Sequence, residues 1–158
     1  AKPVHAYIED AGASAAYWVA SQARTVTANA MAMVGSLGTF TVLHDLSKAA
    51  EMEGVQVHVV STGERKGAAA PGTPVTDEDL AEAQRLVDGF DAFFGAGVRD
   101  GRELGAKESS AIWTGAVWLA AEAKGLGLVD RVEAFDATLE RVSAPLRARA
   151  AKARLASR

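Results

Sequence analysis

The sequence contains no cysteine among its 158 residues, and that absence excludes several chemistries at once. Disulfide bridges, a thiolate nucleophile and cysteine-ligated zinc are all ruled out. The first residues do not have the pattern of a signal peptide, and no apolar run approaches the roughly 20 residues of a membrane span. Its formal charge of −3 gives no reason to expect nucleic acid as a partner. The length of the chain is that of a single domain and is sufficient to bury a hydrophobic core.

Histidine is scarce, with only His5, His44 and His58. His5 and His58 lie inside apolar, strand-like segments, whereas the base of a Ser-His-acid triad needs a place within reach of the serine, at a strand end or in a loop. No two histidines have the spacing of a metal-binding pair. We interpret all three as structural or surface residues, and we expect neither a metal nor another cofactor.

The order of the predicted elements favours an α/β fold. Residues 39–44 alternate as a strand does, residues 48–52 are predicted as a helix that Gly54 ends, and residues 55–60 are the clearest strand. A strand, a short helix and a second strand at this spacing are typical of a βαβ unit, whose strands lie parallel. We therefore predict a parallel sheet.

A long helix is predicted after residue 76. Thr76 is a favourable N-cap, and Asp79 completes a variant of the capping box. Apolar residues at three-to-four spacing predict a buried face of about five turns. They are Leu80, Ala83, Leu86, Val87, Phe90, Phe94 and Val98. Gly89, Gly95 and Gly97 weaken this helix and are expected at close packing contacts.

The last part of the chain is predicted as two helices. One covers residues 116–124, and the other begins at Ala134 and is interrupted or restarted by Pro145. Beyond Leu139, this second region carries six basic residues against one acid, Glu140. They are Arg141, Arg147, Arg149, Lys152, Arg154 and Arg158. A solvated C-terminal helix explains them better than a site for an acidic partner.

Ser14 is the first candidate for chemistry. It lies among small residues, between a predicted strand at Val4–Ile8 and a predicted helix at Ser14–Ala23. Such a corner leaves room for a substrate backbone, and a helix start offers unpaired N–H groups and the positive end of the dipole. The arrangement is that of a nucleophile corner, although the G-x-S-x-G form of the motif is absent. On these residues alone, a helix N-cap is the simpler interpretation of Ser14.

A lysine can replace histidine as the base for a serine nucleophile when burial lowers its pKa. Lys66 follows the predicted strand 55–60, where parallel sheets place their sites, although an ordinary exposed loop lysine is the alternative interpretation. Lys48, on a helix face, is the weaker candidate. Ser36, within the segment Gly35–Gly38, either orients a lysine ammonium or holds the turn. The residues by themselves leave a Ser-Lys dyad as a minority hypothesis.

Several short segments follow one another in an order that is typical of a known protein family. Residues 13–18 read ASAAYW, residues 35–38 read GSLG, and residues 61–66 read STGERK. Further segments of the same series are PVTDE at 74–78, Phe93-Phe94, Gly115-Ala-Val-Trp118 with Ala123, and GLVD at 127–130. Together they resemble the signal peptide peptidase A (protease IV) family of serine peptidases from about Val4 to Val132. Within that family the chain looks most like the phage or prophage head-maturation proteases.

The resemblance implies a ClpP/crotonase-like α/β fold with a βαβ spiral, and peptide hydrolysis through an acyl-enzyme. It implies Ser14 as the nucleophile, Lys66 as the general base, Ser36 as the residue that orients Lys66, and the Ala15 N–H as one oxyanion donor. It also implies a peptide or protein substrate, a homo-oligomer and no cofactor. A cytoplasmic location is expected, as for the phage-type members, unless a preceding segment carries a membrane anchor.

Two departures from the family pattern affect the expected activity. The two glycines that usually follow the nucleophile are Ala15 and Ala16 here, and the family's first half, which supplies another oxyanion N–H, is missing before Ala1. We therefore expect the C-terminal part of a catalytic domain in residues 1–133 and a basic helical tail in residues 134–158. Losing one oxyanion donor costs about 100- to 1,000-fold in rate.

The chain alone is accordingly expected to be weakly active or inactive, unless another segment or chain completes the pocket. Two other functions stay open. One is a non-catalytic assembly or scaffold subunit built on the same fold, and the other is a crotonase-like acyl-CoA enzyme.

Overall fold

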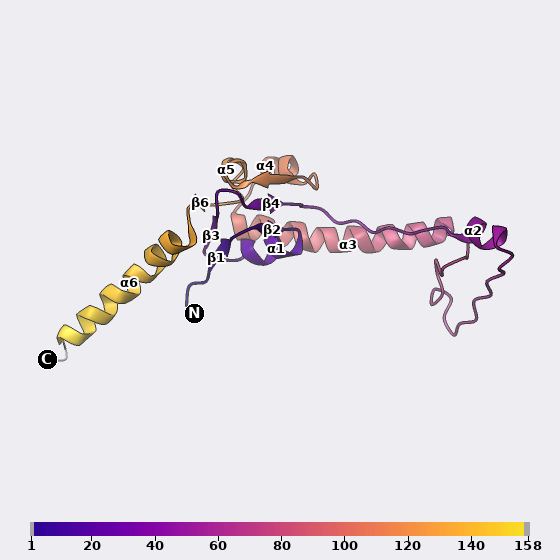
Figure 1. Ribbon diagram of the computed structural model, residues 1–158, viewed down its shortest axis with the longest axis horizontal. Coiled ribbons are helices and arrows are strands. Elements are labelled where there is room, and N and C mark those ends of the chain that lie inside the picture. The colour runs from indigo at the N-terminus through magenta and orange to yellow at the C-terminus, as the bar shows by residue number, and fades with distance from the viewer. Residues whose placement is uncertain (1, 157–158) are drawn as a thin grey trace. The chain divides into compact units, whose positions relative to one another are not determined.

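The computed structural model describes residues 2–156, and Ala1, Ser157 and Arg158 lie outside the described residues. The chain divides into two compact units. The first, here the sheet unit, comprises the chain up to Gly38 together with the chain from Phe93 onward. The second, here the insert unit, comprises Thr39–Ala92. The boundary falls inside the long helix α3 (Asp77–Arg102), which therefore contributes to both units (Figure 1).

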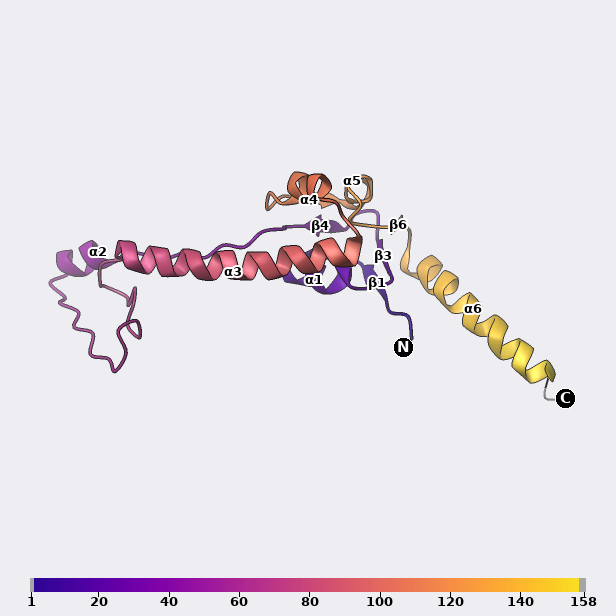
Figure 2. The same cartoon turned by 180° about the vertical axis from the view of Figure 1, so that it is seen from behind.

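Two three-stranded sheets form the centre of the sheet unit (Figures 1 and 2). The first holds three parallel strands, β1 (His5–Ile8), β3 (Thr25–Ala28) and β6 (Arg131–Val132). The second holds β2 (Ala11–Ala13) and β4 (Met33–Gly35), which are parallel, and β5 (Val117–Leu119), which is antiparallel to β4. The chain passes from the first sheet to the second twice, once after β1 and once after β3.

The helix α1 (Ala15–Ser21) connects β2 to β3 along the chain, and each of these strands is parallel to a partner in its own sheet. This arrangement confirms the predicted α/β class with parallel strand pairing. The parallel pairs join β1 to β3, β2 to β4 and β3 to β6, and none of these pairs involves residues 39–60, where the sequence pattern predicted them.

The strands predicted at residues 39–44 and 55–60 are wrong. Both segments pair with no strand in the part of the chain that the structure describes, although the helix between them forms as α2 (Ser47–Met52). A strand exists only where a neighbour accepts and donates its backbone hydrogen bonds. The alternating pattern predicts an extended segment with an apolar face, and here that face stays exposed: Phe40 is 84% and Val55 is 50% exposed.

The long helix begins as predicted. Thr76 Oγ1 accepts a hydrogen bond from the Asp79 N–H at 3.1 Å, and Asp79 Oδ2 accepts one from the Thr76 N–H at 3.0 Å. The predicted buried face of five turns is too long, however, because Leu80 and Phe90 are 51% and 64% exposed and burial begins at Phe94. The buried residues of this helix lie in its part that belongs to the sheet unit, where a core is available.

Close packing explains some of the glycines of α3 but not all. A Cβ atom on Gly97 would overlap the Trp18 ring, and one on Gly101 would overlap the Ser21 carbonyl. At Gly89 nothing lies within 4 Å of such an atom, so the packing prediction is wrong there.

The C-terminal part differs from the prediction in three ways. A helix that was not predicted, α4 (Ala106–Ile112), precedes β5, and the predicted helix 116–124 is shortened to α5 (Ala120–Gly125) because β5 pairs with β4. The last helix, α6 (Phe135–Ala156), runs through Pro145 without a break. Proline removes a single backbone donor, and the turns on either side keep theirs.

Two of the six basic residues of the tail form ion pairs with nearby acids. Arg141 contacts Glu133 at 2.6 Å, and Arg147 contacts Glu140 at 3.1 Å. The side chains of Arg149, Arg154 and Arg158 lie outside the described residues. The exposed Arg147 pair agrees with a solvated helix, whereas the half-buried Arg141 also donates to the Thr27 hydroxyl of β3 at 3.1 Å.

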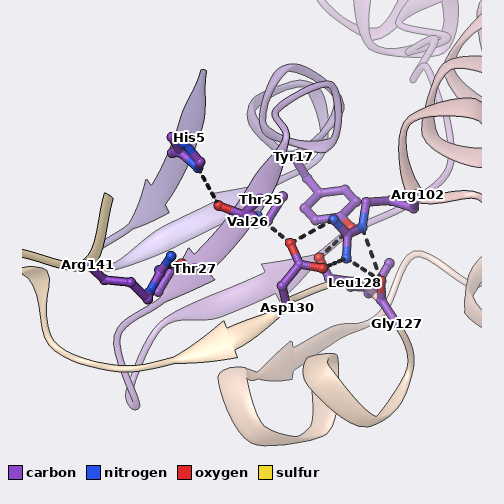
Figure 3. Close-up of polar contacts among 10 residues, drawn as sticks. All are labelled: His5, Tyr17, Thr25, Val26, Thr27, Arg102, Gly127, Leu128, Asp130 and Arg141. Carbon is purple, nitrogen blue, oxygen red and sulfur yellow. Dashed lines mark hydrogen bonds and ion pairs between the residues drawn. The ribbon is translucent and has the colours of Figure 1, made fainter. Parts of the chain in front are cut away.

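A buried polar network joins the C-terminal end of α3 to the strands (Figure 3). The Arg102 guanidinium contacts Asp130 at 2.7 Å and donates to the Gly127 carbonyl at 2.9 Å. Asp130 also accepts the Val26 N–H at 2.6 Å, at the start of β3. The Tyr17 hydroxyl donates to the Leu128 carbonyl at 2.7 Å. Through these bonds, the Gly127 and Leu128 carbonyls and the Asp130 carboxylate of the GLVD segment hold α1, α3 and β3 together.

Candidate active site

Ser14 is the single residue between β2 and α1, at the carboxyl end of a parallel strand. Its backbone has φ 54° and ψ −129°, outside the regions that non-glycine residues ordinarily populate. Its side chain is exposed, as are Ala15 and Ala16 after it. The strand–turn–helix corner with an exposed serine therefore forms as the sequence predicted.

The interpretation of Ser14 as an ordinary helix cap does not agree with this geometry. Ser14 occupies the N-cap position of α1, but its side chain makes no capping hydrogen bond. A capping serine normally has extended backbone angles and accepts an N–H of the first helical turn. The Ser14 hydroxyl is thus not used to stabilise the helix.

Backbone hydrogen bonds fix the Ser14 corner from the neighbouring strand. The Ser14 N–H donates to the Gly35 carbonyl at 2.8 Å, and the Ser36 N–H donates to the Ala116 carbonyl at 2.7 Å. The carboxyl ends of β2 and β4 are therefore adjacent, which is where α/β sheets place their sites. The segment before β5 completes the arrangement, since the Gly115 N–H donates to the Leu37 carbonyl at 2.8 Å.

Ser36 has an unusual conformation for a serine, with φ 52°. It is half-buried, and its hydroxyl forms no hydrogen bond with any described residue. Ser36 holds the turn through its backbone. Its role in orienting Lys66 stays a prediction.

Lys66 lies in the insert unit, as does Lys48, whereas Ser14 and Ser36 lie in the sheet unit. Lys66 is part of an exposed turn in which its N–H donates to the Gly63 carbonyl at 3.0 Å. The Ser61 hydroxyl donates to the same carbonyl at 2.8 Å. The structure thus brings Ser14 and Ser36 together, and the pairing of Ser14 with Lys66 stays a prediction.

The histidines take the roles expected of structural or surface residues. His5 shares a 2.7 Å hydrogen bond with the Thr25 hydroxyl between β1 and β3 (Figure 3), and His44 and His58 are exposed in the insert unit. Within residues 2–156, no histidine bonds to Ser14 and no three acidic or histidine side chains group as a metal site would require.

A comparison with protein families decides the affiliation. The profile of peptidase family S49 matches residues 1–148. The chain belongs to peptidase family S49. This agrees with the resemblance drawn from the short motifs, while the phage-type subgroup stays a prediction.

Individual relatives of this S49 chain are named as proteases. It is 28% identical over 141 residues to the "Putative protease MJ0651" of Methanocaldococcus jannaschii, covering 89% of the chain and 45% of that protein. It is 31% identical over 138 residues to Protease 4 of Haemophilus influenzae, covering 85% of the chain and 22% of that protein. The chain therefore spans less than half the length of these relatives.

Among solved structures, an enoyl-CoA hydratase/isomerase family member is similar to the S49 chain. The TM-score is 0.43 at 21% identity, over 93% of the chain and 39% of that structure's chain. No helix within the described residues combines the length and the apolar character that crossing a bilayer requires.

Two groups of the S49 chain with shifted pKa values, Tyr17 and Asp130, lie in the network of Figure 3, beside or within the Ser14 helix. Burial raises the pKa of Tyr17, three residues after Ser14, well above its ordinary value. Burial opposes ionisation of Asp130, but hydrogen bonds from Arg102 and the Val26 amide outweigh it and hold the pKa of Asp130 below its usual range. Asp130 therefore takes part in the network as a charged carboxylate, and Tyr17 takes part as a neutral phenol that holds α1 in place.

Sequence reasoning missed the contribution of the backbone at Gly35. This glycine has φ +125°, and its carbonyl holds the Ser14 amide. A Cβ atom here would lie 2.7 Å from the Ala116 carbonyl oxygen and 2.7 Å from the Trp118 ring. The two glycines of the GSLG segment were the available signal. The contact with Trp118 comes from β5, in which Val117 lies 82 positions after its partner Gly35, and no local pattern marks that contact.

Proposed function

We propose that this chain carries the nucleophile and the general base of a serine peptidase. The observation that supports this most directly is Ser14, whose hydroxyl is exposed at a strained corner and is not used for capping. Strain of this kind clusters at functional sites because only the surrounding structure maintains it. Membership of peptidase family S49 supplies the reaction class, hydrolysis of a peptide or protein substrate.

In the proposed reaction, Ser14 Oγ attacks the scissile carbonyl carbon while neutral Lys66 Nζ takes the hydroxyl proton. The Ala15 N–H donates to the oxyanion of the tetrahedral intermediate. Collapse of that intermediate breaks the C–N bond, and the Lys66 ammonium returns a proton to the leaving amine. Water, activated by Lys66, then attacks the acyl-enzyme ester and releases Ser14. Ser36 Oγ orients the Lys66 side chain.

The proposed role of Lys66 as a base requires its amine to be neutral. A lysine acts as a base only when it is neutral, which requires burial among apolar groups. Because the Lys66 side chain is exposed in its own unit, the proposal includes a cover formed by bound substrate and by a second copy of the chain. Large exposed apolar side chains of the insert unit, such as Phe40 and Val60, support association into a homo-oligomer.

The test is covalent labelling of the full-length protein with a fluorophosphonate, followed by peptide mapping. Modification at Ser14, lost in Ser14→Ala, is the expected result. No modification of the folded protein would favour the non-catalytic scaffold subunit instead. Saturable binding of coenzyme A without labelling would favour the acyl-CoA enzyme.

A further inference from the structure

The indole ring of Trp118 lies directly against the α-carbon of Gly35, where a side chain would otherwise project. A Cβ atom on Gly35 would come within 2.7 Å of Trp118 Cε3 and within 2.8 Å of Cζ3. The contact follows from the strand register, in which Val34 pairs with Trp118 and Gly35 pairs with Val117 across the antiparallel β4–β5 ladder. Gly35 is buried and Trp118 is half-buried against the core.

Gly35 is also the residue that holds Ser14. Its carbonyl accepts the Ser14 N–H at 2.8 Å, and its φ of +125° is one that other residues rarely adopt. A glycine has the greatest backbone freedom of any residue, so the direction of its carbonyl depends on its surroundings. The Trp118 ring covers one side of this glycine, and the Ala116 carbonyl, which accepts the Ser36 N–H, approaches the same side.

We propose that Trp118 is a positioning residue for Ser14: its ring immobilises Gly35, and the Gly35 carbonyl then keeps the Ser14 backbone in its strained conformation. The proposal rests on the proposed function only in taking Ser14 as the nucleophile. A strained backbone relaxes unless neighbours prevent it, and the Trp118 ring packs against the residue whose carbonyl accepts the Ser14 N–H. Trp118 touches neither substrate nor reacting atoms in this role.

Trp113 provides a matched control for this role. It is also a half-buried tryptophan packed against the core of the sheet unit, with its ring centroid 5.0 Å from that of Phe94. Its ring packs against Phe94 and lies beside Gly95, both on α3. Loss of a large ring at residue 113 therefore weakens the same core without removing the contact with Gly35.

The test compares Trp118→Leu, Trp118→Phe and Trp113→Leu in the full-length protein, with folding checked by circular dichroism. Amide hydrogen exchange of Ser14, relative to that of Val26 in the core strand β3, reports the position of Ser14 without requiring activity. In Trp118→Leu this ratio should rise about tenfold. The rate of fluorophosphonate labelling and kcat should both fall about 100-fold with KM little changed. Trp118→Phe keeps a ring over Gly35 and should lie between the wild type and Trp118→Leu.

Trp113→Leu should speed exchange at Ser14 and Val26 by similar factors, so their ratio stays constant. An unchanged ratio in Trp118→Leu, or in Trp118→Phe if the leucine variant does not fold, overturns the positioning role. A wild-type protein that is never labelled at Ser14 overturns the proposed function instead, while the exchange ratio still decides the role of Trp118.

Discussion

The amide N–H of Ser14 donates a 2.8 Å hydrogen bond to the carbonyl oxygen of Gly35, and this bond joins the carboxyl ends of two parallel strands. It holds Ser14 at φ 54° and ψ −129°. A non-glycine residue in such a region costs on the order of 1–3 kcal/mol of folding free energy. The geometry of the candidate nucleophile is therefore set by backbone contacts, and the Ser14 side chain contributes none of them.

The first prediction follows from that strain. Ser14→Ala should change the free energy of unfolding by less than about 0.5 kcal/mol, because no hydrogen bond of the side chain is lost. Ser14→Gly should be more stable than Ser14→Ala by about 1 kcal/mol, because glycine adopts these angles without strain. Urea denaturation of the two variants measures both differences. A loss above about 1 kcal/mol in Ser14→Ala would mean that the hydroxyl caps α1 after all.

The second prediction separates the two candidate lysines. Lys66→Ala should lower kcat by about 100- to 10,000-fold, the usual contribution of a general base, and should leave the thermal midpoint unchanged because the side chain is exposed. Lys48→Ala is the matched control, since Lys48 is an exposed lysine of α2 in the same unit. Peptide hydrolysis measured for both variants decides between them. Retained activity in Lys66→Ala together with loss in Lys48→Ala would reverse the assignment.

The third prediction compares two glycines of α3. Gly101→Ala should destabilise the protein by about 1–3 kcal/mol, because the added methyl group overlaps the Ser21 carbonyl and the Gln22 side chain. Gly89→Ala adds a methyl group in open space and should stabilise the helix by up to about 1 kcal/mol. Thermal denaturation monitored by circular dichroism should show opposite signs. Equal shifts for both substitutions would contradict the packing of α3 on α1.

The fourth prediction concerns acid stability. The pKa of Asp130 is held below its usual range, so its contribution is present above the ordinary aspartate pKa of about 3.9 and is lost as pH falls through the lower folded value. Asp130→Asn should cost about 2 kcal/mol at pH 7, because Arg102 loses its charged partner. The difference between the variant and the wild type should shrink in the pH range below about 3.9.

Urea denaturation between pH 2 and pH 7 provides the measurement for Asp130, at intervals of about half a unit around the ordinary aspartate pKa. Glu51→Gln, an exposed acid on α2, serves as the control and should leave the curve unchanged. A difference for Asp130→Asn that is constant over the whole range would mean that the carboxylate charge contributes nothing.

Local signals predicted several elements well. The small residues around Ser14 predicted a corner between strand and helix, the strand predicted at Val4–Ile8 forms as β1 (His5–Ile8), and Thr76 caps α3 as its spacing from Asp79 predicted. Each of these depends on residues within a few positions of one another. Such interactions are encoded by neighbours in the chain, so a short sequence pattern is enough to predict them.

The failures have a common physical cause. Residues 55–60 have the strongest alternation in the chain, yet they form no strand within the described residues, whereas the short and less regular segment Val117–Leu119 is β5. A strand is decided by whether a partner edge is available, and alternation does not encode that. The buried face of α3 was overestimated for the same reason, since apolar spacing predicts a face but not what covers it.

By itself, the sequence determined the α/β class, the corner at Ser14, the start of α3 and the motif series of peptidase family S49, because each is carried by neighbouring residues or by motif order. Only the tertiary structure decided that Ser14 has strained backbone angles and makes no capping bond, that the Gly35 carbonyl accepts its N–H, and that the Trp118 ring lies against Gly35. It also decided that Asp130 ties Arg102 to β3. These features depend on hydrogen bonds and packing between residues far apart in the chain, and such contacts exist only once the strands have paired.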